Sequence, residues 1–476
     1  MAFDSVGAIG ERVGTQSPID MGGGREEIRT HGSVGGPAMG AVEAAPWHRG
    51  KTMSHHSIRH ARRLALVLVA ALLVALSGFA PGASATARSH HGGGGEPPAG
   101  PAPYDVVVGG LRNPRGLALS ADGKLYVAEG GVAGDACFAG PSPEGGPDCA
   151  GFSGRISRVN TRSGTRSDYI TGLLSFGGPL FAIGPSGVAV QGNQVLGLMA
   201  ANDKGLPPVE ACASGDCAAV LAAAPTQLGH LLRGVPSGGY RWKQDVGAFN
   251  YDWTVANKNT IGAGNPAYQP GWADNPDFMP GDANPYGLTS LPWGSLMVDG
   301  GANTLTFVPH NGTPKVLAAF PQPDPAHANA YDAVPTCVTT AGGKAIVADL
   351  NGQVFAVDGS SLTVSPAAVT SPDGAFLVSA GGCASDGKGN VYISDIFGGS
   401  VVKLDVSTMS MTWLEPMGTF VFPSGIAVGR EGVVYLSTNS ICPDFPTPAS
   451  NDNPCSNVTG SIVRLHVGDD EHHHRH

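Results

Sequence analysis

One pattern recurs six times along this chain and constrains its fold more than any other feature. Each unit has a Pro-x-Gly-like anchor that opens a short apolar strand, then a Gly-containing turn, a second strand, a loop bearing Asp, Asn or Glu, and a third strand. Repeated units of one kind stack and bury a common core. Because every unit is all-β, we predict a six-bladed β-propeller, with a sandwich of irregular strands as the alternative. The anchors are Pro114-Arg115-Gly116, Pro185-Ser186-Gly187, Pro285-Tyr286-Gly287, Pro335-Thr336-Cys337, Gly381-Gly382-Cys383 and Pro423-Ser424-Gly425.

The two ends of the repeat region predict how the ring closes. The last unit has only three strands, whereas a spare strand at Tyr104–Val108 precedes the first anchor. Pairing this N-terminal strand with the last unit removes two open sheet edges at once. We therefore expect residues 104–466 to form one propeller whose last blade is completed by the N-terminal strand.

The residues before the repeats are typical of an exported protein. Residues 53–85 combine a basic stretch, a 13-residue apolar run at 64–76 and a small-x-small site ending at Ala85, which predicts a signal peptide. The general export route is favoured over the twin-arginine route that Arg62-Arg63 would allow. Residues 1–52 then read as an upstream segment before a true start at Met53, or alternatively as a long leader. Residues 86–103 are a Gly/Pro-rich linker, and residues 467–476 form a His-rich polar tail.

Composition limits the partners of the exported chain. Charged residues make up only 14% of the sequence, whereas Gly occurs 71 times, which fits compact all-β structure. Without residues 1–85 the net charge is about −12, which argues against nucleic acid or an anionic membrane as partner. The apolar run is short for a membrane span, so we expect a secreted monomer with no membrane span in the mature chain.

The eight cysteines predict disulfides, because an even number in an exported protein is typical of a disulfide framework. Three pairs each lie within one insertion, and the fourth pair occupies what we take to be equivalent anchor positions of neighbouring blades. We expect the pairs Cys137/Cys149, Cys212/Cys217, Cys442/Cys455 and Cys337/Cys383.

The long loops are predicted to gather on one face of the propeller. The insertions 130–153, 202–228 and 440–459 each follow a second strand, and 247–284 precedes an innermost strand. In a propeller these connections emerge on the same side, and long loops in a compact domain are usually functional.

The same face carries one polar residue after each second strand. The residues are Glu129, Asp203, Asp299, Asp349, Asp395 and Asn439. They could hold Ca²⁺ or another ligand, because hard cations prefer several oxygen ligands. Their repetition in every unit favours the other interpretation, which is that Asp and Asn cap the backbone of their own turns.

The insertion before the third anchor is rich in aromatic residues and carboxylates. It could stack on and hydrogen-bond a sugar or a polyphenol-like ligand, or its aromatic residues could simply pack on the propeller. The candidate ligand-binding residues are Tyr251, Asp252, Trp253, Trp272, Asp282 and Tyr286.

At these residues the chain resembles the ScyD/ScyE family of exported bacterial proteins. The matching stretches are 106–118, 122–129, 154–159 and 284–288, and the resemblance extends over about 104–466. It implies a secreted six-bladed propeller and brings no assigned chemistry with it. The chain departs from the family in its cysteine-bearing fourth and fifth units.

No catalytic motif is present in the sequence, so two functions stay open. The first is a non-catalytic binding or scaffold module for an extracellular small molecule, glycan or protein. The second is a metal-dependent, lactonase-like hydrolase with its site at the channel mouth. By resemblance to propeller lactonases, a metal could be held by Glu129, Asn113 and Asp349.

Overall fold

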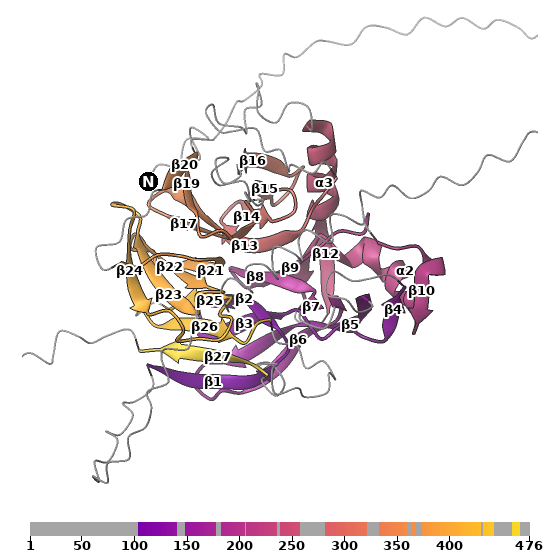
Figure 1. The fold of residues 1–476 in the computed structure, drawn as a ribbon, viewed down its shortest axis with the longest axis horizontal. Helices are drawn as coiled ribbons and strands as arrows, with labels where there is room; N and C mark the ends of the chain where they lie inside the picture. Colours follow the sequence, from indigo (N-terminus) through magenta and orange to yellow (C-terminus); the bar gives the residue numbers. More distant parts are fainter. Residues whose placement is uncertain are drawn as a thin grey trace, which may run out of the picture.

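The strands pair into six antiparallel sheets arranged around a common axis, as the computed structural model shows (Figure 1). The fold is therefore an all-β β-propeller, which confirms that prediction. The structure describes residues 103–139, 148–177, 182–204, 206–235, 239–257, 281–320, 333–358, 364–367, 374–429, 432–441 and 459–466.

We number the sheets by the position of their innermost strand along the chain. The first sheet has β2 (Pro114–Leu119), β3 (Lys124–Glu129), β5 (Asp148–Asn160) and β6 (Arg166–Gly177), and β4 (Ala136–Phe138), β7 (Ala182–Ile183) and β10 (Cys212–Ser214) extend it. The second has β8 (Pro185–Gln191), β9 (Gln194–Met199), β11 (His230–Gly234) and β12 (Tyr240–Asp245). The third has β13 (Pro285–Leu291), β14 (Gly294–Asp299), β15 (Thr304–Pro309) and β16 (Lys315–Ala319).

The remaining sheets follow the same pattern. The fourth has β17 (Pro335–Ala341), β18 (Lys344–Asp349), β19 (Val354–Asp358) and β20 (Val364–Ala367). The fifth has β21 (Ala380–Ser385), β22 (Asn390–Asp395), β23 (Ser400–Asp405) and β24 (Ser410–Glu415). The sixth has β25 (Ile426–Val428), β26 (Val434–Thr438), β27 (Gly460–Leu465) and, outermost, β1 (Tyr104–Leu111), which pairs antiparallel with β27.

The innermost strands approach one another in chain order, and the last contacts the first: β2, β8, β13, β17, β21, β25 and again β2 are neighbours. Glycines make this approach possible. A Cβ added to Gly116 would lie 2.8 Å from the carbonyl oxygen of Ser186, and one on Gly425 would overlap the carbonyl of Arg115. The Gly of the anchor is therefore needed because it leaves room for the neighbouring backbone.

Hydroxyl groups tie the same strand ends together. Each donates to a carbonyl of the next sheet in chain order, and the sixth sheet donates to the first. The bonds are Ser186 Oγ to Pro285 O (3.1 Å), Thr336 Oγ1 to Ala380 O (2.7 Å), Ser394 Oγ to Ser424 O and Ser437 Oγ to Arg115 O (3.1 Å). We call these four bonds the hydroxyl girdle.

The core lies between neighbouring sheets, because alternate residues of each strand face opposite sides of the sheet. Between the third and fourth sheets, for example, Val298 and Leu305 pack with Val338, Val347 and the fully buried Phe355. Burial of such apolar side chains is worth about 1.5–3 kcal/mol each and stabilises the ring of sheets.

Three of the four predicted disulfides are present: Cys137–Cys149, Cys212–Cys217 and Cys337–Cys383. Cys442 and Cys455 lie outside the described residues. The predicted equivalence of Cys337 and Cys383 is wrong by one residue. In the strand register, Cys337 lies opposite Ala348, and the equivalent residue of the fifth sheet is Gly382, which lies opposite Ser394. The fifth anchor is therefore Ala380-Gly381-Gly382, and Cys383 follows it.

Helices interrupt the purely β pattern that the repeats predict. Within the described residues, α2 (Cys217–Gln227) lies in the second insertion and α3 (Val246–Asn257) begins the insertion that precedes the third anchor. A short 3₁₀ turn, η1, spans Val209–Ala211. Neither helix in the described part of the chain is long and apolar enough to cross a membrane.

The first two insertions form a lateral lobe instead of covering the channel. Strand β10 of the second insertion pairs with β4 of the first, and α2 packs beside them at the rim in Figure 1. The Gln227 side chain accepts a hydrogen bond from the Leu174 backbone at 2.7 Å, which fastens α2 to β6. Two disulfides staple this lobe, which comprises β4, β10, α2 and the adjoining ends of β5 and β6.

Candidate functional site

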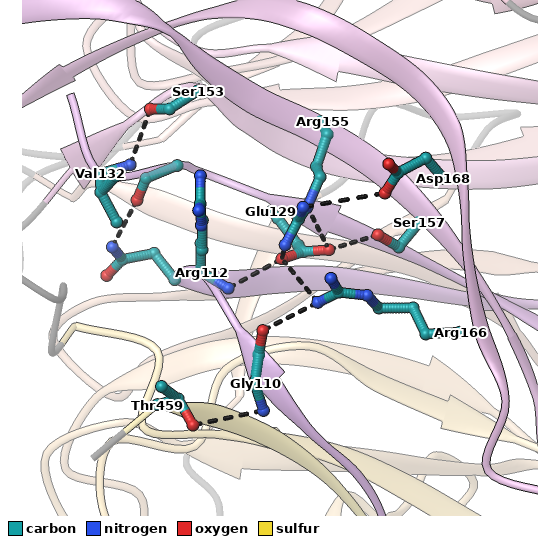
Figure 2. A network of polar contacts seen from close by, with 12 residues as sticks. Gly110, Arg112, Glu129, Val132, Ser153, Arg155, Ser157, Arg166, Asp168 and Thr459 are labelled. Carbon is teal, nitrogen blue, oxygen red and sulfur yellow. Dashed lines mark hydrogen bonds and ion pairs between the residues drawn. The ribbon is translucent and has the colours of Figure 1, made fainter. Parts of the chain in front are cut away.

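Glu129 ends β3, has no exposed surface and is saturated by donors of its own chain (Figure 2). Its carboxylate accepts bonds from Nε and Nη2 of Arg155 at 3.0 and 2.9 Å, and from the Arg112 backbone at 2.7 Å. The hydroxyl of Ser157 donates to it as well, and Arg166 Nη1 lies 4.0 Å away. A metal ion at this carboxylate would have to displace two guanidinium groups, so Glu129 does not fit a metal ligand.

The corresponding carboxylates of three other sheets cap their own loops. Asp299 accepts backbone bonds from Asn284, Gly301 and Ala302 at 2.6–3.0 Å. Asp395 accepts from Val378, Ser379 and Gly398, and Asp349 from Asn351 and Gln353. These contacts support the interpretation of the polar ring as turn chemistry.

Burial governs the ionisation of these capping groups. It raises the pKa of Asp299 to about 6 despite the bonds from Ala302 and Asn250, which act in the opposite direction. It also raises the pKa of Asp395, and it raises that of Asp349 well above its usual range. A buried carboxyl without a neighbouring cation favours its neutral form, because charge is poorly solvated there.

The proposed metal ligands come from different sheets. Asn113 precedes β2 in the first sheet and donates to Gly131 O at 2.7 Å, whereas Asp349 ends β18 of the fourth sheet. Asn113 Oδ1 and Asp349 Oδ2 are both buried, and neither has a hydrogen-bond partner in the described part of the chain. Across the described residues, no group of three or more His, Cys, Asp or Glu side chains has the arrangement of a metal site.

The aromatic insertion is represented by α3 and by the residues before β13. Lys204 pairs with Asp252 at 2.7 Å and lies 4.9 Å from the ring centroid of Tyr251, so it links the second insertion to α3. Trp253 is also on α3. Asp282 lies three residues before Pro285, and burial raises the pKa of Asp282. Trp272 lies outside the described residues.

Asn250 fastens α3 to the third sheet. Its side-chain amide donates to Asp299 Oδ2 at 2.8 Å and accepts from Thr306 Oγ1 at 2.9 Å. Thr254, one turn further along, accepts from the Gly281 backbone at 2.9 Å. All three contacts are buried or half-buried, so α3 is an integral part of the propeller end.

The sequence analysis missed Arg115, which reaches from the first sheet to the third. Its Nη1 donates to the hydroxyl of Tyr286 at 2.8 Å, its Nη2 donates to Ala182 O at 2.7 Å, and its guanidinium lies 5.5 Å from the Tyr286 ring centroid. Arg115 and Tyr286 are the middle residues of their anchors, so both start innermost strands at the end that carries the long loops. The signal was visible, because Arg115 is the single charged residue at that anchor position.

The charge of Arg115 is not neutralised by a carboxylate within the described part of the chain. Both of its hydrogen-bonded partners are neutral oxygens, and its Nε is buried without a partner. A half-buried guanidinium in this state attracts an anion, since charges in such sites are normally paired. Tyr286 accepts the bond from Arg115, which leaves its own proton available for donation.

Comparison with known proteins finds only distant structural likenesses. No protein-family model and no curated protein matches the chain. Among solved structures, a protein of unknown function from Bacteroides thetaiotaomicron is similar, with 9% identity over 76% of this chain and 75% of that one and a TM-score of 0.44. Virginiamycin B lyase from Staphylococcus aureus has 12% identity over 68% and 76% (TM-score 0.36), and a streptogramin B lyase has 10% over 75% and 94% (TM-score 0.37). Likenesses this distant say nothing about chemistry.

Proposed function

We propose that this chain is a secreted β-propeller that binds an extracellular ligand at its loop-bearing end without transforming it. The observation that carries the proposal is the contrast between two sets of polar groups at that end. The carboxylates accept hydrogen bonds from backbone amides and arginines, whereas Arg115 and Tyr286 have N–H and O–H groups without a partner among the described residues. Free donors beside satisfied carboxylates fit recognition better than acid-base work.

We further propose that the six sheets are six blades of one propeller, closed by the N-terminal strand, and that the chain is related to the ScyD/ScyE family. Support for the closure comes from the pairing of β1 with β27 and from the contact of β25 with β2. Disulfides between described cysteines are consistent with export, because such bonds persist in oxidising compartments.

The direct test is a thermal-shift screen of the secreted protein against glycans, polyphenols and cell-wall fragments. A ligand is expected to raise the midpoint of unfolding in the native chain and not in R115M, because it binds the folded state. An R241M variant, which removes a cation from the outer strand β12, is the matched control. Turnover of a bound compound at an enzymatic rate would refute the proposal.

A metal-dependent, lactonase-like hydrolase is the second candidate. What supports it is the pair of buried oxygens without partners, on Asn113 and Asp349. What counts against it is the arginine-bound carboxylate of Glu129. Metal analysis of the dialysed protein separates the two: bound Ca²⁺ or another divalent ion that N113A or D349N removes would favour the hydrolase.

A further inference from the structure

Two residues at the loop-bearing end have backbone conformations that their side chains disfavour. Val334 has φ +44° and Phe422 has φ +42°, and each immediately precedes the anchor Pro of its unit. Asn113 occupies the same place before Pro114 with φ +51°. Asn and Gly enter this left-handed region readily, whereas a β-branched or aromatic residue rarely does.

The backbone strain indicates that the apolar side chains of Val334 and Phe422 have a role at these positions. Asn would satisfy the local backbone geometry with less strain, yet Val and Phe are present, and both are only partly buried. Strained positions of this kind cluster at functional sites, where the surrounding structure holds them in place.

Val334 and Phe422 have apolar neighbours at the loop-bearing end. Leu350 donates its backbone N–H to Val334 O at 3.0 Å, and the rings of Phe397 and Phe422 lie 6.5 Å apart. These residues come from the fourth, fifth and sixth sheets, and Val421, beside Phe422, is 50% exposed. Arg115 and Tyr286 come from the first and third sheets, so charge and apolar surface lie on different parts of the ring.

We propose that this end binds a small amphiphilic carboxylate with a flat apolar body. Its carboxylate accepts hydrogen bonds from the second N–H of Arg115 Nη1 and of Nη2 and from the Tyr286 hydroxyl, and its apolar body lies against Val334 and Phe422. Charge complementarity selects the anion, because Arg115 has no carboxylate partner among the described residues. The inference rests on the proposed function and names the ligand class of the same site.

The probes are 2-naphthoate, its neutral isostere 2-naphthamide, and acetate, each titrated calorimetrically into the full-length secreted protein. We expect 2-naphthoate to bind and the other two to bind at least about tenfold more weakly. 2-Naphthamide lacks the negative charge, and acetate lacks the flat apolar body. R115M is expected to weaken 2-naphthoate by about tenfold or more, and R241M to leave its affinity unchanged.

The strained residues give a readout that a purely structural role would not produce. F422N and V334N should keep or raise the midpoint of unfolding, because they relieve backbone strain, and should still weaken 2-naphthoate. F152N, which changes an exposed Phe of β5, should leave the affinity unchanged. Loss of stability in both Asn variants would show that the side chains serve packing and would overturn the inference.

Two further results would overturn it. Equal affinity for 2-naphthoate and 2-naphthamide would show that the negative charge of the ligand does not contribute to binding. Failure of 2-naphthoate to bind, while the wider screen yields a ligand that depends on Arg115, would refute the ligand class and leave the proposed binding function standing.

Discussion

Cys337 and Cys383 form a bond between neighbouring innermost strands although they stand one register position apart. Their Cα atoms are 5.6 Å apart, within the usual range of about 4.4–6.8 Å. Cys337 occupies the place where Gly287 and Gly187 stand in the preceding sheets, and a Cβ at Gly287 would point at the backbone of Thr336 and Cys337. A side chain there is directed towards the next sheet, which explains why Cys337 reaches Cys383.

Replacing both cysteines, as in C337G/C383V, restores the residue types of the other sheets and should still destabilise the protein. The bond spans 46 residues, so its removal should lower the free energy of unfolding by about 4 kcal/mol on the chain-entropy model. The measurement is urea unfolding without reductant. C212A/C217A opens a loop of only 5 residues and should lose about 2 kcal/mol. A larger loss in that control would contradict the prediction.

Substitution of Glu129 should lower the free energy of unfolding more than substitution of any exposed acidic residue. E129Q leaves Arg155 half-paired in a buried setting, and breaking such a pair typically costs about 3–5 kcal/mol. D122N, which removes an exposed pair with Lys124, should leave stability almost unchanged, because solvent screens exposed ion pairs. The double variant E129Q/R155M should recover part of the loss. Equal midpoints for E129Q and D122N in chemical unfolding would refute this account.

Asp299 should stabilise the protein less as pH rises from about 4 to 7. The pKa of Asp299 is raised by burial from its ordinary value to about 6, so the folded state binds the proton more tightly than the unfolded state. The stabilisation is complete below the unfolded pKa and is lost as pH passes about 6, by at most about 3 kcal/mol for this group.

The pH profile of D299N isolates this contribution, because an amide does not titrate. Thermal midpoints between pH 4 and 8 should fall less steeply in D299N than in the native chain. The slope should not vanish, since burial raises the pKa of Asp349 and Asp395 in the same direction. A native midpoint that increases from pH 5 to 7 would show that the four donors to Asp299 outweigh its burial.

A methyl group at Gly425 should disrupt the ring, because its Cβ would overlap the carbonyl of Arg115. We expect G425A to lower secreted yield and to destabilise by more than about 3 kcal/mol, since overpacked backbone contacts cannot relax through a side chain. G109A is the matched control, because its nearest atom, Ser461 Oγ, would lie at an ordinary 3.6 Å. Comparable behaviour of the two variants would mean that the innermost strands can move apart.

The repeat and the turn chemistry made the propeller predictable, whereas the two helices were not. The helix α3 contains Gly247, Thr254 and Val255, which are weak helix formers, and Pro225 lies inside α2. Tertiary contacts decide the structure there: Asn250 bridges Asp299 and Thr306, and this pairing is invisible in a linear pattern.

The site was predictable only in part for the same reason. The sequence placed Tyr286 among the candidate ligand residues, and its anchor position was clear. That Arg115 passes the second sheet to reach Tyr286 depends on the width of the ring, which no spacing along the chain encodes. Glu129 was taken as a metal candidate because Arg155 and Arg166, its partners, lie 26 and more residues away.

The hydroxyl girdle runs in one rotational sense: its four bonds link the second sheet to the third, and the fourth sheet through the fifth and sixth to the first. An open solenoid can gain or lose a repeat at either end and remain a solenoid. The ring of sheets here has no such freedom, because β25 of the last sheet contacts β2 of the first. Deletion of a unit would remove strands that both neighbouring sheets contact, whereas changes in the loops leave the circumference unaltered.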